Sequence, residues 1–228
     1  MASKIHTFGC SFTYGQGFPD SLGVGSEYPQ SKYAWPSLLK ELVDQEVVNH
    51  SWCGASGLYI LRAIYQKQSE FAQGDTIIVQ WPFITRWSVI TGENLNDIFN
   101  MTPGTSHVPG TPDWEMYSTH FSNTRHEVEM FCMLSQSVSN FCKSNNLRYM
   151  QRIYSHLDLR DIRAYKPEWY NIKHPHIALN SCLEDNHHRR LNKLLDADIG
   201  HLPDYHLNEG AHKYWALSIH NELKRDDT

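Results

Sequence analysis

The sequence lacks several features that would place it at once in a large class of proteins. It contains no run of 18 apolar residues and no block of lysine or arginine, and the formal net charge of its 228 residues is −5. These absences argue against a membrane-spanning segment and against a nucleic-acid or membrane-surface footprint. The first apolar segment begins almost at Met1, which leaves no room for a signal peptide. We therefore expect a soluble, cytoplasmic protein.

Disulfide and metal-binding patterns are also missing. The five cysteines are irregularly spaced without a Cys-x-x-Cys pair, which favours free thiols in a reducing compartment. Histidine is abundant, with 14 residues, but the pairs at 174–176 and 187–188 lack the i, i+4 spacing and the acidic partner of a zinc site. We expect neither a metal ion nor a cofactor.

What the sequence does contain is an alternation of strand-like and helix-like segments, over a length that suits one domain covering 1–228. The expected strands cover 4–10, 46–52, 74–81 and 147–154, and the expected helices cover 35–43, 56–67, 128–141 and 208–224. This alternation indicates an α/β fold with a mostly parallel central sheet, covered by helices on both faces.

Two stretches depart from the alternation. Residues 92–124 are polar and punctuated by glycine and proline, so they are predicted to form a long loop inserted into the domain. Residues 156–173 show little periodicity and lead to an expected helix at about 179–195.

Residues with catalytic potential follow the expected strands. Ser11 stands in "GCSFTYG" after the first strand, and Gly54 stands in "NHSWCGASG" after the second. Asp204 and His206 precede the last helix in "LPDYHLNEGAH". In a parallel sheet, loops at the carboxyl ends of the strands gather at one edge, so these residues are expected to lie together.

Together these residues supply the roles of a serine hydrolase. A serine hydroxyl is a weak nucleophile, so Ser11 needs a base such as His206, which in turn needs an orienting acid such as Asp204. The backbone N–H groups of Ser11 and Gly54 are suited to stabilise the oxyanion. Each motif alone is weak, because a serine beside glycine is ordinary turn chemistry.

The three motifs, in this order, resemble the sequence blocks of the SGNH (GDSL-like) hydrolases, with departures similar to those of divergent, phage-like members. The resemblance covers 9–216, with Cys10 where the family usually has Asp. It implies a flavodoxin-like α/β/α sandwich and an esterase with Ser11 as nucleophile. The block that normally offers an Asn reads "VQWPFITRW" here, so either Gln80 or the Trp81 indole is the third oxyanion donor, or the third donor is missing.

The choice of base stays open on spacing alone. Asp198 and His201 have the three-residue separation that is commonest in the family, whereas Asp204 and His206 are one residue closer. We favour His206, because the sequence that follows it matches the family's entry into the last helix.

The sequence thus predicts an esterase whose partner is a small acyl ester or an O-acylated carbohydrate. Trp81 and Arg86 are candidate substrate-binding residues, although an arginine at this point often pins a loop instead. An acyltransferase with the same triad is one alternative, and a binding or structural module with little turnover is the other.

Overall fold

The protein was analysed as a computed structural model, which describes residues 3–21, 29–90, 92, 98–101, 123–154, 156–170 and 207–226. The described part contains a parallel sheet in the strand order β2-β1-β3-β6. Its strands are β1 (Ile5–Phe8), β2 (Val47–Asn49), β3 (Thr76–Trp81) and β6 (Arg148–Ile153). A separate antiparallel hairpin pairs β4 (Trp87–Ile90) with β5 (Ile98–Met101).

The described helices are α1 (Ser11–Tyr14), α2 (Trp35–Lys40), α3 (Gly57–Gln66), the short 3-10 turn η1 (Gln68–Glu70), α5 (Thr124–Ser144), α6 (His156–Tyr165) and α9 (Glu209–Asp226). Side chains fix where two of them begin. Ser56 accepts the backbone N–H of Tyr59 at the start of α3, and Asn123 accepts that of His126 at the start of α5.

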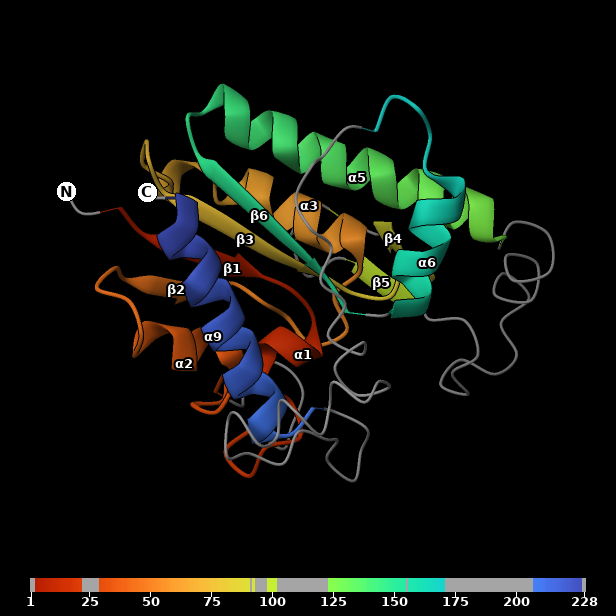
Figure 1. Ribbon diagram of the computed structural model, residues 1–228. Coiled ribbons are helices and arrows are strands. Elements are labelled where there is room, and N and C mark those ends of the chain that lie inside the picture. Colours follow the sequence, from red (N-terminus) through yellow and green to blue (C-terminus); the bar gives the residue numbers. More distant parts are fainter. Residues whose placement is uncertain are drawn as a thin grey trace.

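The helices cover the sheet on both faces, as Figure 1 shows. α2 and α9 pack together on one face, whereas α3 and α5 pack together on the other. This division follows from right-handed crossovers, because the chain moves outward from β1 to β2 and then back across β1 to β3 and β6. The α/β/α fold with a mostly parallel sheet, expected from the sequence, is confirmed.

Every expected strand and helix in the described part forms, and the differences lie elsewhere. β5 lies inside the stretch predicted as a loop at 92–124, so that prediction was wrong for 98–101. The stretch at 156–173, read as irregular, contains α6. The helix expected at about 179–195 lies outside the described residues. Within the described part, no helix is long and apolar enough to cross a bilayer.

A buried polar cluster joins the first three strands. Nε2 of His6 lies 3.3 Å from Oδ2 of Asp75, and Nδ1 of His6 lies 3.0 Å from Nε2 of His50. The carboxylate only accepts, so His6 donates to Asp75 and accepts from His50. Burial lowers the pKa of His6, although Asp75 opposes this, and burial lowers the pKa of His50 to about 4. Both imidazoles are therefore neutral near pH 7.

We expect this cluster to make the fold sensitive to acid. The folded pKa of His50 lies below the ordinary histidine value of 6.5, so the unfolded chain binds the proton more tightly. His50 alone should therefore lower the free energy of unfolding as the pH drops from 6.5 to about 4, by about 3 kcal/mol, and the loss should level off below that pH. Urea unfolding of wild type and His50→Gln across this range measures the effect.

The His50→Gln variant keeps an N–H donor for His6 but has no titrating ring, so its stability should depend less on pH over this interval. Neighbouring charges modify the size of the effect, because Lys67 lowers the pKa of His50 and Glu70 raises it. Equal pH dependence in both proteins would show that His50 is not the group responsible.

Candidate active site

Ser11 is placed at the carboxyl edge of the sheet. It is the first residue of α1, three positions after β1 ends, and its side chain is buried in the described structure. Its carbonyl accepts the N–H of Gly15, whose φ of 83° ends this single turn of helix. A left-handed residue is tolerated best as glycine, which accounts for the glycine that ends "GCSFTYG".

The turn that carries Ser11 leaves no space for a side chain at Gly9, two residues earlier. A Cβ atom added to Gly9 would lie 2.0 Å from Oγ1 of Thr13. Glycine is therefore required here by close packing. Because Phe8 pairs with Val79 in the sheet, Gly9 lies level with Gln80 at the end of β3.

The glycine-bearing loop after β2 is fastened to the serine turn. The N–H of Trp52 donates to the carbonyl of Gly9 at 3.1 Å, and the side-chain amide of Asn49 donates to the carbonyl of Thr13 at 3.2 Å. Gly54 follows in this loop with a φ of 80°, a conformation that favours glycine. The loops after β1 and β2 thus lie against one another, as the sequence predicted.

Gln80 joins the third strand end to the same turn. Its Oε1 accepts from Oγ1 of Thr13 at 2.5 Å and from the indole N–H of Trp35 at 3.0 Å. Its amide nitrogen is buried and has no hydrogen-bond partner among the described residues. A buried amide donor without a partner costs free energy unless a ligand accepts from it, so Gln80 keeps its candidacy as an oxyanion donor.

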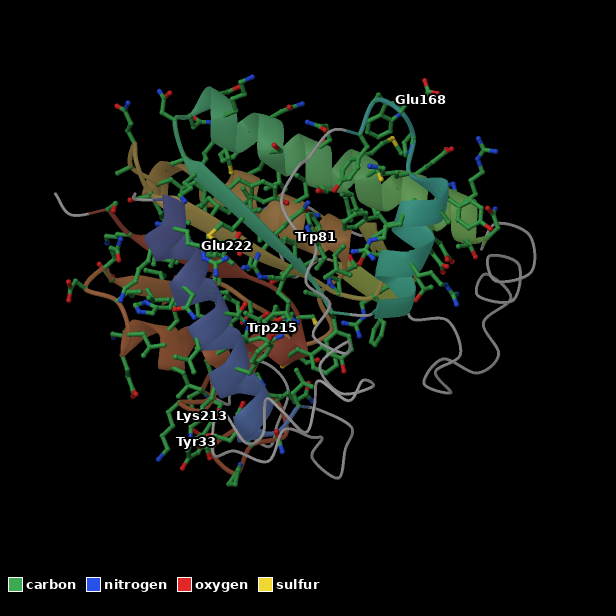
Figure 2. The ribbon with its side chains drawn as sticks, viewed as in Figure 1. Tyr33, Trp81, Glu168, Lys213, Trp215 and Glu222 are labelled. Atoms are coloured by element: carbon green, nitrogen blue, oxygen red, sulfur yellow. The ribbon has the colours of Figure 1, made fainter. Side chains whose placement is uncertain are left out.

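The Trp81 indole has a different role. Its N–H donates to Oε1 of Gln151 at 3.0 Å, and the side chain is 1% exposed, inside the molecule (Figure 2). Gln151 also accepts from the hydroxyls of Ser135 and Tyr149. The indole N–H is therefore used within the core, which leaves Gln80 as the candidate donor of the two. The ring of Trp81 still lines an apolar pocket.

Arg86 holds the glycine loop. Its Nη1 donates to the carbonyl of Ala55, the residue after Gly54, at 3.2 Å. Its Nε is buried and has no hydrogen-bond partner among the residues described. The arginine thus pins a loop, which is one of the two interpretations of the sequence, and retains one N–H that a substrate oxygen can accept.

The predicted base and acid, His206 and Asp204, lie outside the described residues, as do Asp198 and His201. Leu207, the residue that follows His206 in the sequence, is buried in the core. The first turns of α9 pack beside the segment that follows the serine turn, since the ring of His212 lies 5.2 Å from that of Phe18. The other end of α9 lies at the start of β6, where Arg148 donates to the carbonyl of Leu223.

Burial keeps Cys53 and two tyrosines in this region protonated. Burial raises the pKa of Cys53, directly before Gly54, to about 12, an effect that Cys10 reinforces and Arg86 opposes. Burial also raises the pKa of Tyr14 and of Tyr154. A thiol is nucleophilic only as thiolate, so Cys53 is inert near pH 7. Within the described residues, no group of three histidine, cysteine or acidic side chains is placed to hold a metal ion.

Sequence reasoning missed Thr13 and Asn49, the two residues that hold the site's loops together. Thr13 bridges the serine turn to Gln80, while Oδ1 of Asn49 accepts from Thr7 and from the N–H of Ser51. A signal was present, because each polar residue adjoins an apolar strand or a glycine turn at the edge where the candidate site was expected.

Comparison with known proteins identifies the fold. A member of the lipolytic protein G-D-S-L family from Veillonella parvula DSM 2008 is 14% identical, with a TM-score of 0.52 over 96% of this chain and 98% of that one. A carbohydrate esterase family 2 enzyme with a carbohydrate binding domain from Corynascus thermopiles (Myceliophthora fergusii) is 10% identical, with a TM-score of 0.48 over 97% of this chain and 65% of that one. No protein-family model and no curated protein matches the chain. At such low identity the likeness establishes the fold alone, and the chain therefore has the fold of a G-D-S-L lipolytic protein.

Proposed function

We propose that the protein is a serine esterase that hydrolyses a small acyl ester or an O-acyl group on a carbohydrate. Ser11 attacks the ester carbonyl while His206 takes the hydroxyl proton, and Asp204 orients the imidazole and stabilises its charged form. The alkoxide leaves with the proton held by His206. Water, deprotonated by His206, then cleaves the acyl-enzyme and restores Ser11.

One observation carries this proposal. Hydrogen bonds hold the turn that bears Ser11 to two other strand ends. One runs from Trp52 in the glycine loop after β2, and another joins Thr13 to Gln80 at the end of β3. An ordinary surface turn has no need of such fastening, whereas a nucleophile must be held against its oxyanion donors. The fold supports the proposal further, because a lipolytic protein of the G-D-S-L family shares it.

The proposed oxyanion site has three donors: the N–H groups of Ser11 and Gly54, and the amide of Gln80. The amide nitrogen of Gln80 has no hydrogen-bond partner among the described residues, so Gln80 can replace the Asn that the family resemblance implies. Arg86 supports the site through its bond to Ala55, which fixes the peptide after Gly54.

A screen of p-nitrophenyl esters and acetylated sugars tests the function. We expect hydrolysis that rises with pH through one ionisation in the histidine range, because only neutral imidazole acts as a base. EDTA should leave the rate unchanged. Hydrolysis that EDTA abolishes and zinc restores would replace the serine mechanism by a metal-dependent one.

Removing the amide donor of Gln80 should lower kcat by about 10² to 10³ with little change in KM, as loss of one oxyanion donor does. Gln80→Glu removes the N–H₂ group but keeps an acceptor for Thr13 and Trp35. Gln80→Met removes the donor without adding a charge, so comparing the two variants separates these effects. Steady-state kinetics that keep kcat within about threefold in both variants would exclude Gln80 from the oxyanion site.

A further inference from the structure

An apolar pocket lies beside the candidate site and has no role in the proposed mechanism. Its volume is about 70 Å³. Its walls come from α3, the end of β3, the hairpin strand β4 and α5. The main lining side chains are Leu58, Trp81, Phe83, Trp87, Phe131 and Leu134.

The pocket is connected to both halves of the site. The ring of Phe83 lies 6.3 Å from the ring of Phe12, the residue next to Ser11. Arg86, which also lines the pocket, donates to Ala55 next to Gly54. The polar end of the pocket is therefore the end nearest the glycine loop, and its remaining walls are aromatic and aliphatic.

The walls are held in place independently of any ligand. The hydroxyl of Ser88 on β4 donates to that of Ser56, the residue that caps α3. Next to Ser56, Gly57 leaves room for its neighbours, because an added Cβ would lie 2.9 Å from Cδ1 of Leu134 and 3.5 Å from the Trp81 ring. The pocket is thus a preformed space, and its size is set by Gly57 and Leu134.

We propose that this pocket holds the acyl chain of the substrate and restricts it to about three or four carbons. A dry cavity of about 150 Å³ accommodates benzene, so a cavity half as large suits a short aliphatic chain. The ester group lies at the polar end beside Gly54, and the alkyl tail lies among the rings. This inference rests on the proposed esterase function and specifies its substrate class.

Chain-length profiles test the inference. For wild type, kcat/KM should rise by about fourfold for each CH₂ that the pocket buries, from p-nitrophenyl acetate to the butyrate, and should rise no further with the hexanoate or octanoate. Leu134→Ala should raise the ratio of hexanoate to butyrate by at least about tenfold, because it makes room for about two more CH₂ groups. Gly57→Ala should lower the ratio of butyrate to acetate.

Val138→Ala is the matched control, because it removes apolar atoms from a buried position of the same helix, outside the pocket lining. It should leave the chain-length profile unchanged. Identical profiles in Leu134→Ala, Gly57→Ala and wild type would overturn the inference while leaving the esterase function intact.

A binding measurement decides the question without turnover. In Ser11→Ala, methyl butyrate should change the tryptophan fluorescence saturably, since Trp81 and Trp87 line the pocket, and adding Gly57→Ala should remove the change. Absence of Ser11-dependent hydrolysis would overturn the proposed function alone. Absence of a saturable change that depends on Gly57 would overturn the inference.

Discussion

Replacing Ser11 with alanine is expected to lower kcat/KM for ester hydrolysis by at least about 10³, because loss of a triad nucleophile removes the covalent route. The effect should appear in kcat, with the folded state intact, since the hydroxyl is the only group removed. The thiol of Cys53 cannot replace Ser11 as nucleophile. Burial raises its pKa to about 12, so the thiol stays protonated near pH 7.

Ser51→Ala is the matched control for this experiment. Ser51 is also a buried serine at the carboxyl edge of the sheet, in the loop after β2, and its hydroxyl has no hydrogen-bond partner among the described residues. Its replacement should change kcat/KM by less than about threefold if only Ser11 is the nucleophile. An equal loss of kcat/KM in the two variants would indicate that removing any buried hydroxyl here disturbs the site, so the loss would not identify the nucleophile. Full activity of Ser11→Ala would show that Ser11 is not the nucleophile.

Replacing His206 with alanine should lower kcat by at least about 10³, whereas His201→Ala should change it by less than about tenfold. The placement of the last helix supports this ranking. Leu207, which follows His206 in the sequence, is buried, and α9 begins at Glu209 beside the segment that follows the serine turn.

His212, the first histidine of α9, is not an alternative base. Its Nδ1 accepts the backbone N–H of Trp35 at 2.9 Å, and its side chain is 2% exposed. That bond gives it a structural role between α9 and α2. Measured kcat values, with circular dichroism to show that both variants are folded, test the ranking. The reverse ranking would assign the triad to Asp198 and His201.

Much of the fold could be predicted because the core residues recur at strand or helix spacing. All six residues of β3 are buried, which matches the continuous apolar run read as a buried strand. In α5, the apolar residues Val128, Phe131 and Val138 form the buried stripe that predicted the helix.

The missed elements lack that signal. In α6, Leu157, Leu159 and Ile162 are interspersed with charged residues and make too short a stripe to stand out, so its sequence reads as irregular. The strand β5 contains only four residues, and the glycine and proline around it indicate a loop. Its pairing with β4 supplies the order that its own sequence does not.

The candidate site was predictable in its residues but not in its connections. Ser11 and Gly54 each follow a recognisable strand, so a parallel sheet brings them to one edge. The bond between Thr13 and Gln80 joins residues 67 positions apart, and no local pattern indicates it. The local sequence does not indicate the hydrogen bond from the Trp81 indole to Gln151 either. This bond, which uses the indole N–H within the core, depends on the pairing of β3 with β6.

The most direct test of the central claim is labelling with a fluorophosphonate probe, followed by mass spectrometry of the peptides. An activated serine attacks the phosphorus centre, whereas a serine in an ordinary turn does not. We expect one stoichiometric adduct, located on Ser11 and absent from Ser11→Ala and His206→Ala. An adduct on another residue, or labelling that persists unchanged in Ser11→Ala, would contradict the assignment of Ser11 as the nucleophile.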